Sequence, residues 1–375
     1  MTAPIQTWLV EPLKRDVAVA LERLAASDDV RRIAVMPDVH LAEDVCIGTV
    51  VATERMLYPA AVGGDIGCGV AALRLECDAD MLRDETAAAW LLARLYEHVP
   101  ALQHAVARAP ELPMAIGDDV LSDPRLERIK RREGRLEFGT LGRGNHFLEF
   151  QRDDEGSAWL MVHSGSRALG QAIRDHHLRD APRSTTGLAY LDGGSERGRA
   201  YLHDVEWALR YADVSRRAMA ERVAALIDER FGTNADWASF VSCHHNHVRR
   251  ETHDGTSWWV HRKGAIPAAL GEPGIIPGSM GSPSFHVEGR GHEPALASSS
   301  HGAGRALSRS EARRAISRRD LFRQLEGVLF DRRRAEQLRD EAPRAYKDIR
   351  AVMRAQRDLT RIVRTVHPVL SYKGT

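Results

Sequence analysis

The sequence predicts an α+β fold in which helices flank β-sheets and polar loops at strand ends carry the functional residues. Segments with apolar residues at helical spacing alternate with short runs rich in β-branched residues. Several of these runs end in loops of glycine, histidine and aspartate, such as residues 63–70 and 163–167. The alternation continues without internal repeats or low-complexity linkers, so we expect a single domain over residues 1–375.

Helical spacing of apolar residues predicts helices along the whole chain. In residues 81–98, for example, Leu82, Leu91 and Leu95 fall on one face. The last helical segment contains Pro343, where we expect an interruption because proline removes a backbone donor. The predicted helices are residues 17–26, 81–98, 202–231, 307–317 and 335–363.

Short apolar runs bounded by turn residues predict the strands. The run WLMVH, for example, ends directly at the polar segment SGSR. Residues 271–284 are rich in glycine and proline and are expected to form a loop. The predicted strands are residues 33–36, 47–52, 70–75, 147–150, 159–163, 240–242 and 258–262.

The composition narrows the class of protein. The net charge is +1 with 28% charged residues, so the chain carries no overall polyanion-binding signal. Basic residues are nevertheless concentrated in two short runs, residues 125–135 and 308–320. Each run could be the solvent-exposed face of a helix or could contact a nucleic acid. Four cysteines in 375 residues do not form a disulfide framework, and we find no secretion signal or membrane-length apolar run. We therefore expect a cytoplasmic protein.

The loop GGDIGCGV places Asp65 and Cys68 three residues apart among glycines. Glycine lets the backbone adopt positive φ and approach other groups closely, so both side chains can point at one spot. A carboxylate beside a thiol indicates a metal site or an activated nucleophile. The alternative is a tight turn with Cys68 as a small buried apolar residue.

Four histidines also lie at strand ends or in glycine loops. They are His146 in GRGNHFLEF, His163 in HSGSR, His245 in CHHNH and His301 in HGAGR. Imidazole, thiolate and carboxylate together form a ligand set for a transition metal. A single histidine of this kind is more often a hydrogen-bonded structural residue, but the combination favours a common site.

The segment HGAGR resembles a phosphate-handling site. The amides at Gly302 and Gly304 can cradle phosphate oxygens, Arg305 can pair with them, and His301 can act as a nucleophile. Alternatively, His301 precedes a helix over 303–315 that Ser300 or a neighbouring residue caps. The loop 276–284 suits a nucleotide, and Arg262 and Lys263 add positive charge at another strand end.

Taken in order from Met36 to Gly374, the motifs of this chain resemble those of the RtcB family of RNA ligases. They are MPDVH, GGDIGCGV, GRGNHFLEF, VHSGSRALG, HRKGA, IPGSMGSPSF, SSSHGAGRALSR, EAPRAYKDI and SYKG. The resemblance implies that the protein joins a 2′,3′-cyclic phosphate or 3′-phosphate RNA end to a 5′-hydroxyl end. It implies GTP and two manganese ions as cofactors, although the soft ligand set alone would suggest zinc.

The resemblance also implies roles for individual residues. Cys68 resembles a thiolate that bridges both metals, with Asp65 and His146 completing one site and His163 and His245 the other. His301 resembles the histidine that becomes covalently attached to GMP, and Asp38 the carboxylate that orients it. Asn145 and Arg167 resemble phosphate or RNA contacts, and the residues that resemble the guanine pocket are Phe147, Glu149, Ser279, Ser284, Tyr346 and Lys373. With the candidates from the loops described above, the residues expected to form the nucleotide pocket are Asn145, Phe147, Glu149, Ser279, Ser284, Gly302, Gly304, Tyr346 and Lys373. The residues expected to contact RNA or phosphate are Arg167, Arg305, Arg262 and Lys263.

Some segments depart from the family pattern and put the RNA substrate in doubt. Residues 41–50 read LAEDVCIGTV, Ser215 replaces an expected asparagine, and CHHNH carries extra histidines. The expected partner is RNA with broken ends, which arises in tRNA splicing or needs repair. We expect no association with a membrane, and an activating protein is a further possible partner. We expect a monomer or weak oligomer. The alternatives are a metal-dependent phosphodiesterase or cyclic phosphatase, or a non-catalytic protein that binds RNA ends.

Overall fold

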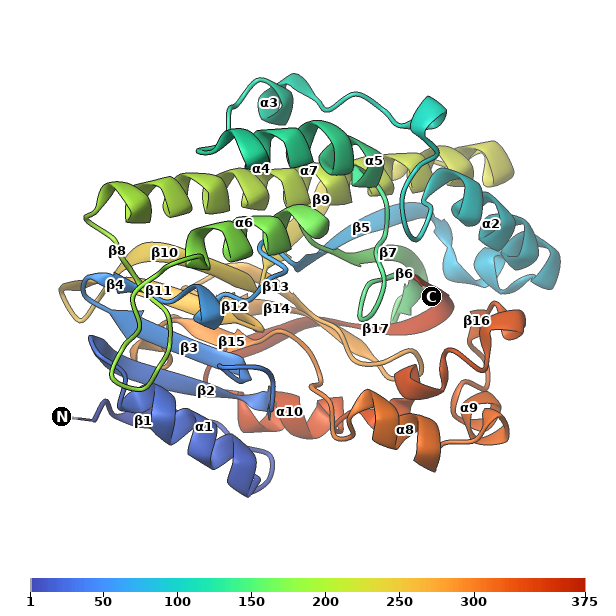
Figure 1. Ribbon diagram of the computed structural model, residues 1–375. Helices are drawn as coiled ribbons and strands as arrows, with labels where there is room; N and C mark the ends of the chain where they lie inside the picture. The colour runs from blue at the N-terminus through green and yellow to red at the C-terminus, as the bar shows by residue number, and fades with distance from the viewer. Residues whose placement is uncertain (1, 375) are drawn as a thin grey trace.

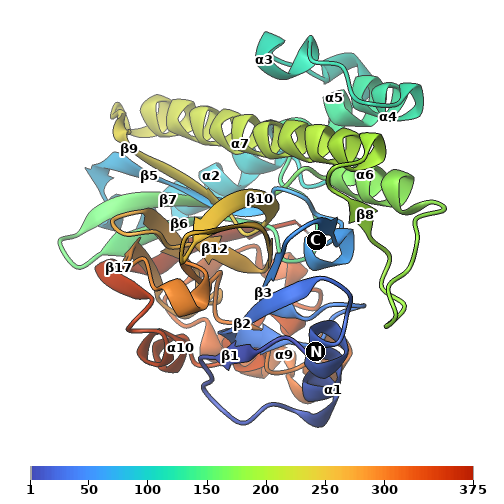
Figure 2. The ribbon, with the colours of Figure 1, turned by 90° about the vertical axis from the view of Figure 1, so that its left-hand side faces the viewer.

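The computed structural model describes residues 2–374 and confirms the α+β fold. Two groups of strands lie between two groups of helices (Figure 1). The long helix α7 (Glu196–Phe231) crosses one side of the sheets, and α3, α4 and α5 lie beyond it (Figure 2). The helices α1, α8, α9 and α10 cover the opposite side (Figure 1). Among the described residues, no helix is both long enough and apolar enough to cross a bilayer.

The larger sheet is mainly antiparallel and has the order β13-β14-β17-β6-β7-β5-β9, with β16 beside β17. Its edge strands β9 and β13 lie against each other, so the sheet is nearly closed. Its strands are β5 (Gly69–Asp78), β6 (Phe147–Asp153), β7 (Ser157–Ser164), β9 (Ala235–His244), β13 (Pro273–Ile276), β14 (Ser284–Gly289), β16 (Leu329–Phe330) and β17 (Thr360–Lys373).

The second sheet has the order β1-β2-β3-β11-β10. Two further strand pairs, β12-β15 and β4-β8, join the surrounding segments. These strands are β1 (Ile5–Thr7), β2 (Val30–His40), β3 (Ile47–Thr53), β4 (Met56–Leu57), β8 (Leu191–Asp192), β10 (Asn246–His253), β11 (Thr256–Lys263), β12 (Ala265–Pro267) and β15 (Ser298–Ser300).

Helix α7 shows why these residues form a long helix. The Ser195 side chain accepts a hydrogen bond from the Gly198 amide at its start, and Gly232 ends it in the left-handed conformation with φ +65°. Its buried face, which includes Met219 and Val223, packs in the same apolar cluster as β5, β6 and β7. The other helices are α1 (Arg15–Ala25), α2 (Glu85–His98), α3 (Met114–Gly117), α4 (Pro124–Ile129), α5 (Arg135–Glu137), α6 (Ala168–Leu178), α8 (Arg309–Ala315), α9 (Arg318–Gln324) and α10 (Ile349–Ala355).

Most predicted strands and the helices over 17–26 and 202–231 are confirmed, but the prediction for residues 335–363 is wrong. That segment contains short 3-10 turns and the single helix α10, and β17 begins at Thr360. The sequence TRIVRTVHPVLSYK is rich in β-branched residues and pairs with β6 and β14. The loop expected over 271–284 contains β13, and Asp84 caps α2, so the helix predicted over 81–98 is divided there.

Strand pairing gathers the predicted functional residues at one end of the larger sheet. Gly69 at the start of β5 pairs with Ser164 at the end of β7 and with His244 at the end of β9. Phe147 at the start of β6 pairs with both His163 and Lys373. Because neighbouring strands run in opposite directions, segments far apart in the sequence meet at this edge.

Candidate functional site

The loop between the 3-10 turn at residues 59–61 and β5 brings Asp65 and Cys68 together. The Cys68 amide donates to the Asp65 carbonyl at 3.1 Å, which closes a tight turn. Gly67 has φ +72°, and its Cα lies against α7, where an added Cβ would be 3.2 Å from the Ala208 carbonyl oxygen. A Cβ at Gly69 would lie 2.2 Å from the Cys243 carbonyl oxygen. Both positions therefore require glycine.

Two groups of potential metal ligands share the Cys68 thiol. One contains Asp65, Cys68 and His146, and the other contains Cys68, His163 and His245, with ligand atoms within 4.8 Å of one another in each group. Cys68 Sγ lies 3.4 Å from His146 Nε2 and 3.3 Å from His163 Nε2. His146 Nε2 is 2.9 Å from Asp65 Oδ2, and the Nε2 atoms of His163 and His245 are 3.0 Å apart.

The electrostatics of these groups suit a cation. Burial holds the pKa of His163 and His245 well below the usual range, so both imidazoles are neutral and have a lone pair for a metal. Burial, with the charge of Asp65, raises the pKa of the Cys68 thiol. Burial opposes ionisation of Asp65 as well, but His146 outweighs it and keeps the pKa of that carboxyl below its usual range. Because a bound cation favours the thiolate, this donor set fits a transition metal better than an empty buried cluster.

The structure brings His245, and not His244, into the second group. His244 Nδ1 instead lies 3.1 Å from the Arg216 guanidinium. The fully buried Arg216 also donates to the carbonyl oxygens of Gly67 and Ser164, at 2.9 and 2.8 Å, and so holds the loops that carry Cys68 and His163. Sequence reasoning did not identify Arg216, because its partners are 52 and 149 residues away.

Ser215, which departs from the family pattern, has a structural role. Its buried hydroxyl accepts a hydrogen bond from the Gly139 amide at 3.0 Å. The contact ties α7 to the loop that leads to His146. Ser215 is not a member of either group of potential metal ligands.

His301 follows β15 and lies beside the second ligand group. Its Nδ1 is 2.6 Å from Oδ2 of the fully buried Asp38, and its ring centroid is 4.6 Å from that of His245. The alternative helix over 303–315 is wrong, because α8 begins only at Arg309 and is capped by Ser308. Gly304 has φ +72°, and an added Cβ would lie 2.3 Å from the Asp38 carbonyl oxygen. Glycine is thus needed for HGAGR to pack against Asp38.

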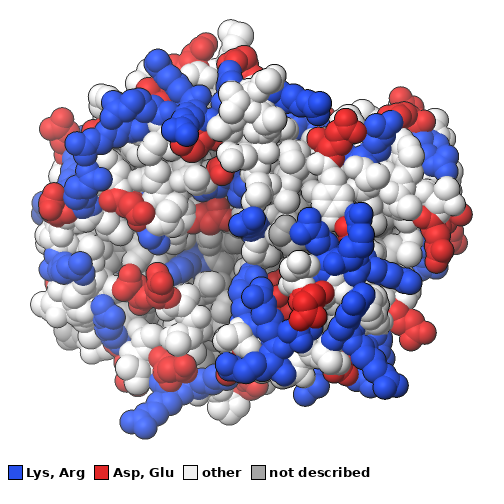
Figure 3. All heavy atoms as spheres, turned by 45° about the vertical axis from the view of Figure 1, so that its right-hand side comes forward, with Lys and Arg blue, Asp and Glu red and all other residues white. Residues whose placement is uncertain are grey.

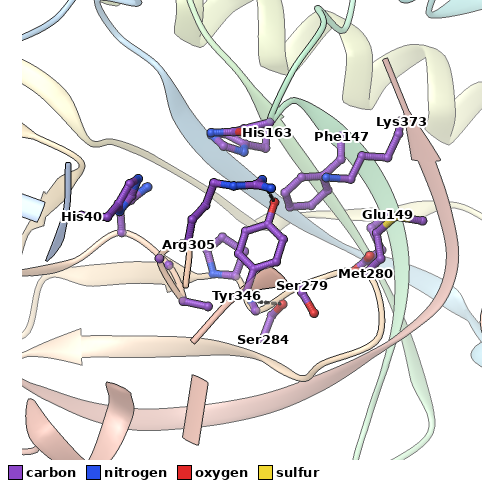
Figure 4. Close-up of a pocket in the computed structure, with 17 residues that line it drawn as sticks. His40, Phe147, Glu149, His163, Ser279, Met280, Ser284, Arg305, Tyr346 and Lys373 are labelled. Atoms are coloured by element: carbon purple, nitrogen blue, oxygen red, sulfur yellow. Dashed lines mark hydrogen bonds between the residues drawn. The ribbon is translucent and has the colours of Figure 1, made fainter. Parts of the chain in front are cut away.

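A cavity lined by polar and aromatic side chains opens beside His301. Figure 4 shows Arg305 and Tyr346 within it, with His40 on one side and Phe147 and Lys373 on the other. All nine residues expected to form the nucleotide pocket line this cavity: Asn145, Phe147, Glu149, Ser279, Ser284, Gly302, Gly304, Tyr346 and Lys373.

A network of buried charged side chains lies at the part of the cavity formed by Arg305, Tyr346 and Lys373. Glu341 pairs with Lys373 and lies 3.3 Å from Arg305, and these cations outweigh burial and keep its pKa low. The Tyr346 hydroxyl donates to Glu341 at 2.7 Å and accepts from Arg305 at 3.0 Å. Burial raises the pKa of Glu149 to about 8, opposed by Gln151 and Lys373. Sequence reasoning assigned no role to Glu341, although it lies in the quoted motif EAPRAYKDI.

The residues expected to contact RNA divide into different environments. Arg262 is fully buried and pairs with Glu251 at 2.5 Å, so it is not available to a ligand in solution. Lys263 reaches the Glu43 carbonyl oxygen at 3.2 Å, and burial lowers its pKa to about 8. Arg167 donates to the Leu102 carbonyl at 2.8 Å. Arg305 lines the cavity.

His40, Met280 and Lys347 also lie at this site and were not predicted. His40 and Met280 line the cavity, and the Lys347 ammonium donates to the Pro37 and Val39 carbonyl oxygens on either side of Asp38. His40 belongs to the motif MPDVH, which is the signal that could have identified it.

Comparisons with known proteins give a consistent result. The family model described as tRNA-splicing ligase RtcB matches residues 20–122 and 117–374. RNA-splicing ligase RtcB of Escherichia coli K12 is 36% identical over 406 aligned positions, covering 99% of this chain and 98% of that protein. RNA-splicing ligase RtcB of Mycobacterium tuberculosis H37Rv is 32% identical, with 92% of this chain and 97% of that protein covered. The tRNA-splicing ligase RtcB of Methanococcus maripaludis is 28% identical over 92% of this chain and 88% of that protein.

Proposed function

This chain belongs to the RtcB family of RNA ligases, and we propose from that premise that it is a GTP- and manganese-dependent ligase. It would join RNA ends bearing a 2′,3′-cyclic phosphate or 3′-phosphate to 5′-hydroxyl ends, through a GMP–histidine intermediate. The role would be RNA repair or tRNA splicing. We further propose that residues 1–375 act as one domain, and that the protein works in the cytoplasm, where its four free cysteines would stay reduced.

The observation that carries this proposal is the position of His301. Its ring centroid lies 4.6 Å from that of His245 in a potential metal group, and the same side chain lines the cavity. A nucleophile of this kind must reach a nucleotide phosphate and a charge-neutralising cation at the same time. A protein that only binds RNA ends needs no buried Asp38–His301 pair.

In the proposed reaction, His301 Nε2 attacks the α-phosphorus of GTP, a P–N bond forms and pyrophosphate leaves. Asp38, 2.6 Å from Nδ1, fixes the ring with Nε2 toward the cavity and stabilises positive charge on the imidazole. A 2′,3′-cyclic phosphate end is first opened by water to a 3′-phosphate. An oxygen of the RNA 3′-phosphate then attacks the phosphorus of the bound GMP, and the P–N bond to His301 breaks. Finally the 5′-hydroxyl attacks this activated phosphate and GMP leaves.

The two ligand groups would hold the metal ions, with Cys68 shared between them. When bound, such ions supply charge neutralisation and alignment for phosphoryl transfer. We assign manganese from the family resemblance, since the soft sulfur and nitrogen donors by themselves suit zinc.

RNA would approach over the basic surface beside the cavity. Figure 3 shows Lys and Arg side chains around a hollow and in numbers over the lower half of this face. The exposed Arg313 and Arg314 belong to α8, and the exposed Arg318 and Arg319 belong to α9. Helix α8 begins at Arg309, which contacts Asn145 of the cavity wall. Cations in this position attract phosphates without reading sequence.

The test is covalent labelling with α-labelled GTP and Mn²⁺. We expect wild-type protein to acquire acid-labile GMP, and His301→Ala to acquire none. His203→Ala is a matched control, because that histidine lies on α7 and contacts the Val120 carbonyl instead of the cavity. No label on wild-type protein, or equal label on His301→Ala, would refute the proposal. A phosphodiesterase would open cyclic phosphate ends without any label.

A further inference from the structure

The buried side chain of Gln151 bridges two walls of the nucleotide cavity. Its Nε2 donates to Glu149 Oε1 at 2.7 Å and to the Ser284 hydroxyl at 3.3 Å. Glu149 and Gln151 lie on the same face of β6 because alternate residues of a strand point the same way. Ser284 begins β14, which is separated from β6 by β17.

The Ser284 hydroxyl extends this bridge to the loop that lines the cavity. It accepts a hydrogen bond from the Gly278 amide at 3.1 Å. The Gln151 side-chain amide therefore holds the Glu149 carboxyl group directly. Through the Ser284 hydroxyl, it also holds Gly278 in the loop that lines the cavity. Gln151 does not itself line the cavity, so its effect must pass through these two neighbours.

We propose that Gln151 is a positioning residue that sets the preference for guanine by holding the Glu149 carboxylate. This inference rests on the proposed function, and it assigns recognition of the base to Glu149, one of the residues expected to form the nucleotide pocket. Burial favours the protonated form of Glu149 in the free protein. The N1–H and 2-amino donors of guanine favour the carboxylate, which can accept a hydrogen bond from each of them. Adenine has an unprotonated N1 and no 2-amino group, so a correctly oriented carboxylate disfavours it.

The surroundings of Glu149 explain why an additional positioning group is needed. Glu149 is 3% exposed and Gln151 is fully buried, so water cannot replace a lost partner. The nearby cation Lys373 is paired with Glu341. The Gln151 amide donates to Oε1 of Glu149 at 2.7 Å, and the remaining lone pairs of the two oxygens are left for the base.

Base preference is tested by labelling with α-labelled GTP and ATP at several concentrations. Gln151→Met keeps the length of the side chain and removes the donor. We expect about a tenfold loss of the GTP-over-ATP preference, the size expected for one hydrogen bond to a carboxylate. We expect this loss mainly as a higher KM for GTP, with the maximal labelling rate largely kept, because His301 is untouched.

Gln356→Met is the matched control. Gln356 is also fully buried, but it accepts from the Ser300 amide and contacts Met353, away from the base wall. Its loss should lower stability without changing the GTP-over-ATP ratio. If Gln151→Met does not fold, Gln151→Asn keeps an amide but is too short to reach Glu149, and it should show the same loss of preference.

The outcomes separate the two proposals. Wild-type protein that takes no label from GTP overturns the proposed function and this inference together. Labelled wild-type protein with an unchanged ratio in Gln151→Met, or in Gln151→Asn if only that variant folds, overturns the inference alone. An equal loss of preference in Gln356→Met also overturns it, because the effect would then be one of general stability.

Discussion

Replacing Cys68 by alanine tests whether one thiolate serves two metal ions. Cys68 is the one ligand shared by the two groups found among the described residues. Without it, Asp65 and His146 remain on one side, and His163 and His245 on the other. Each group thus falls from three ligand atoms to two.

The expected magnitude follows from this loss. Changing a residue that only supports a ligand costs about 10–100-fold in metal affinity. Losing a direct ligand in both groups should therefore weaken each site by at least about 100-fold. Asp65→Ala removes a ligand from one group only, so one site should survive.

Metal binding is measured by isothermal titration with Mn²⁺ and by metal content after dialysis. We expect two ions for wild-type protein, one for Asp65→Ala and close to none for Cys68→Ala. Cys243→Ala is the control, because that thiol is also buried but packs in an apolar cluster outside both groups. Two ions retained by Cys68→Ala, or an equal loss of both ions in Asp65→Ala, would refute the shared-ligand reasoning.

Three further predictions follow from other contacts. Asp38→Asn should slow GMP labelling of His301 at least tenfold, measured by quenched time courses, because a neutral amide stabilises the charged imidazole less than the carboxylate 2.6 Å away; an unchanged rate would contradict this role. Arg216→Met should lower the unfolding free energy by about 3 kcal/mol in urea titrations, because buried carbonyls lose their donor, and should weaken Mn²⁺ binding about tenfold. Burial raises the pKa of Glu149 from 4.5 to about 8, so the folded protein keeps a proton that the unfolded chain releases. The unfolding free energy should then fall as pH rises from about 4.5 to about 8, and Glu149→Gln should flatten this decline in a pH series of denaturation curves.

Local patterns in the sequence were sufficient to identify the residues that are expected to perform the chemistry. GGDIGCGV, GRGNHFLEF, HSGSR and CHHNH contain the members of both ligand groups, and His301 stands out in HGAGR. Their chemistry depends on residue type, and each lies in a short motif at a strand end. Helix α7 was equally predictable, because its apolar face continues over ten turns without proline.

Long-range packing decided the rest. The segment from 335 was expected to be helical, but Thr360–Lys373 became a strand because β6 and β14 provide pairing partners on both sides. Charge alone suggested that Arg262 faces RNA, yet Glu251 pairs with it in the interior. The β-branched residues of Thr360–Lys373 are a local signal for a strand. The partner of Arg262, in contrast, could not be predicted from its position at a strand end.

The sequence by itself determined the family, the α+β class and the identity of the donor atoms. The family resemblance had already implied that Cys68 is shared and that His245 is a ligand. Only the tertiary structure showed that Arg216 holds the loops that carry Cys68 and His163, that Gln151 contacts Glu149, and that Arg262 is buried. The physical reason is the range of the interactions. A side chain carries its own chemistry wherever it stands, whereas burial and hydrogen-bond partners depend on strands that lie tens to hundreds of residues apart.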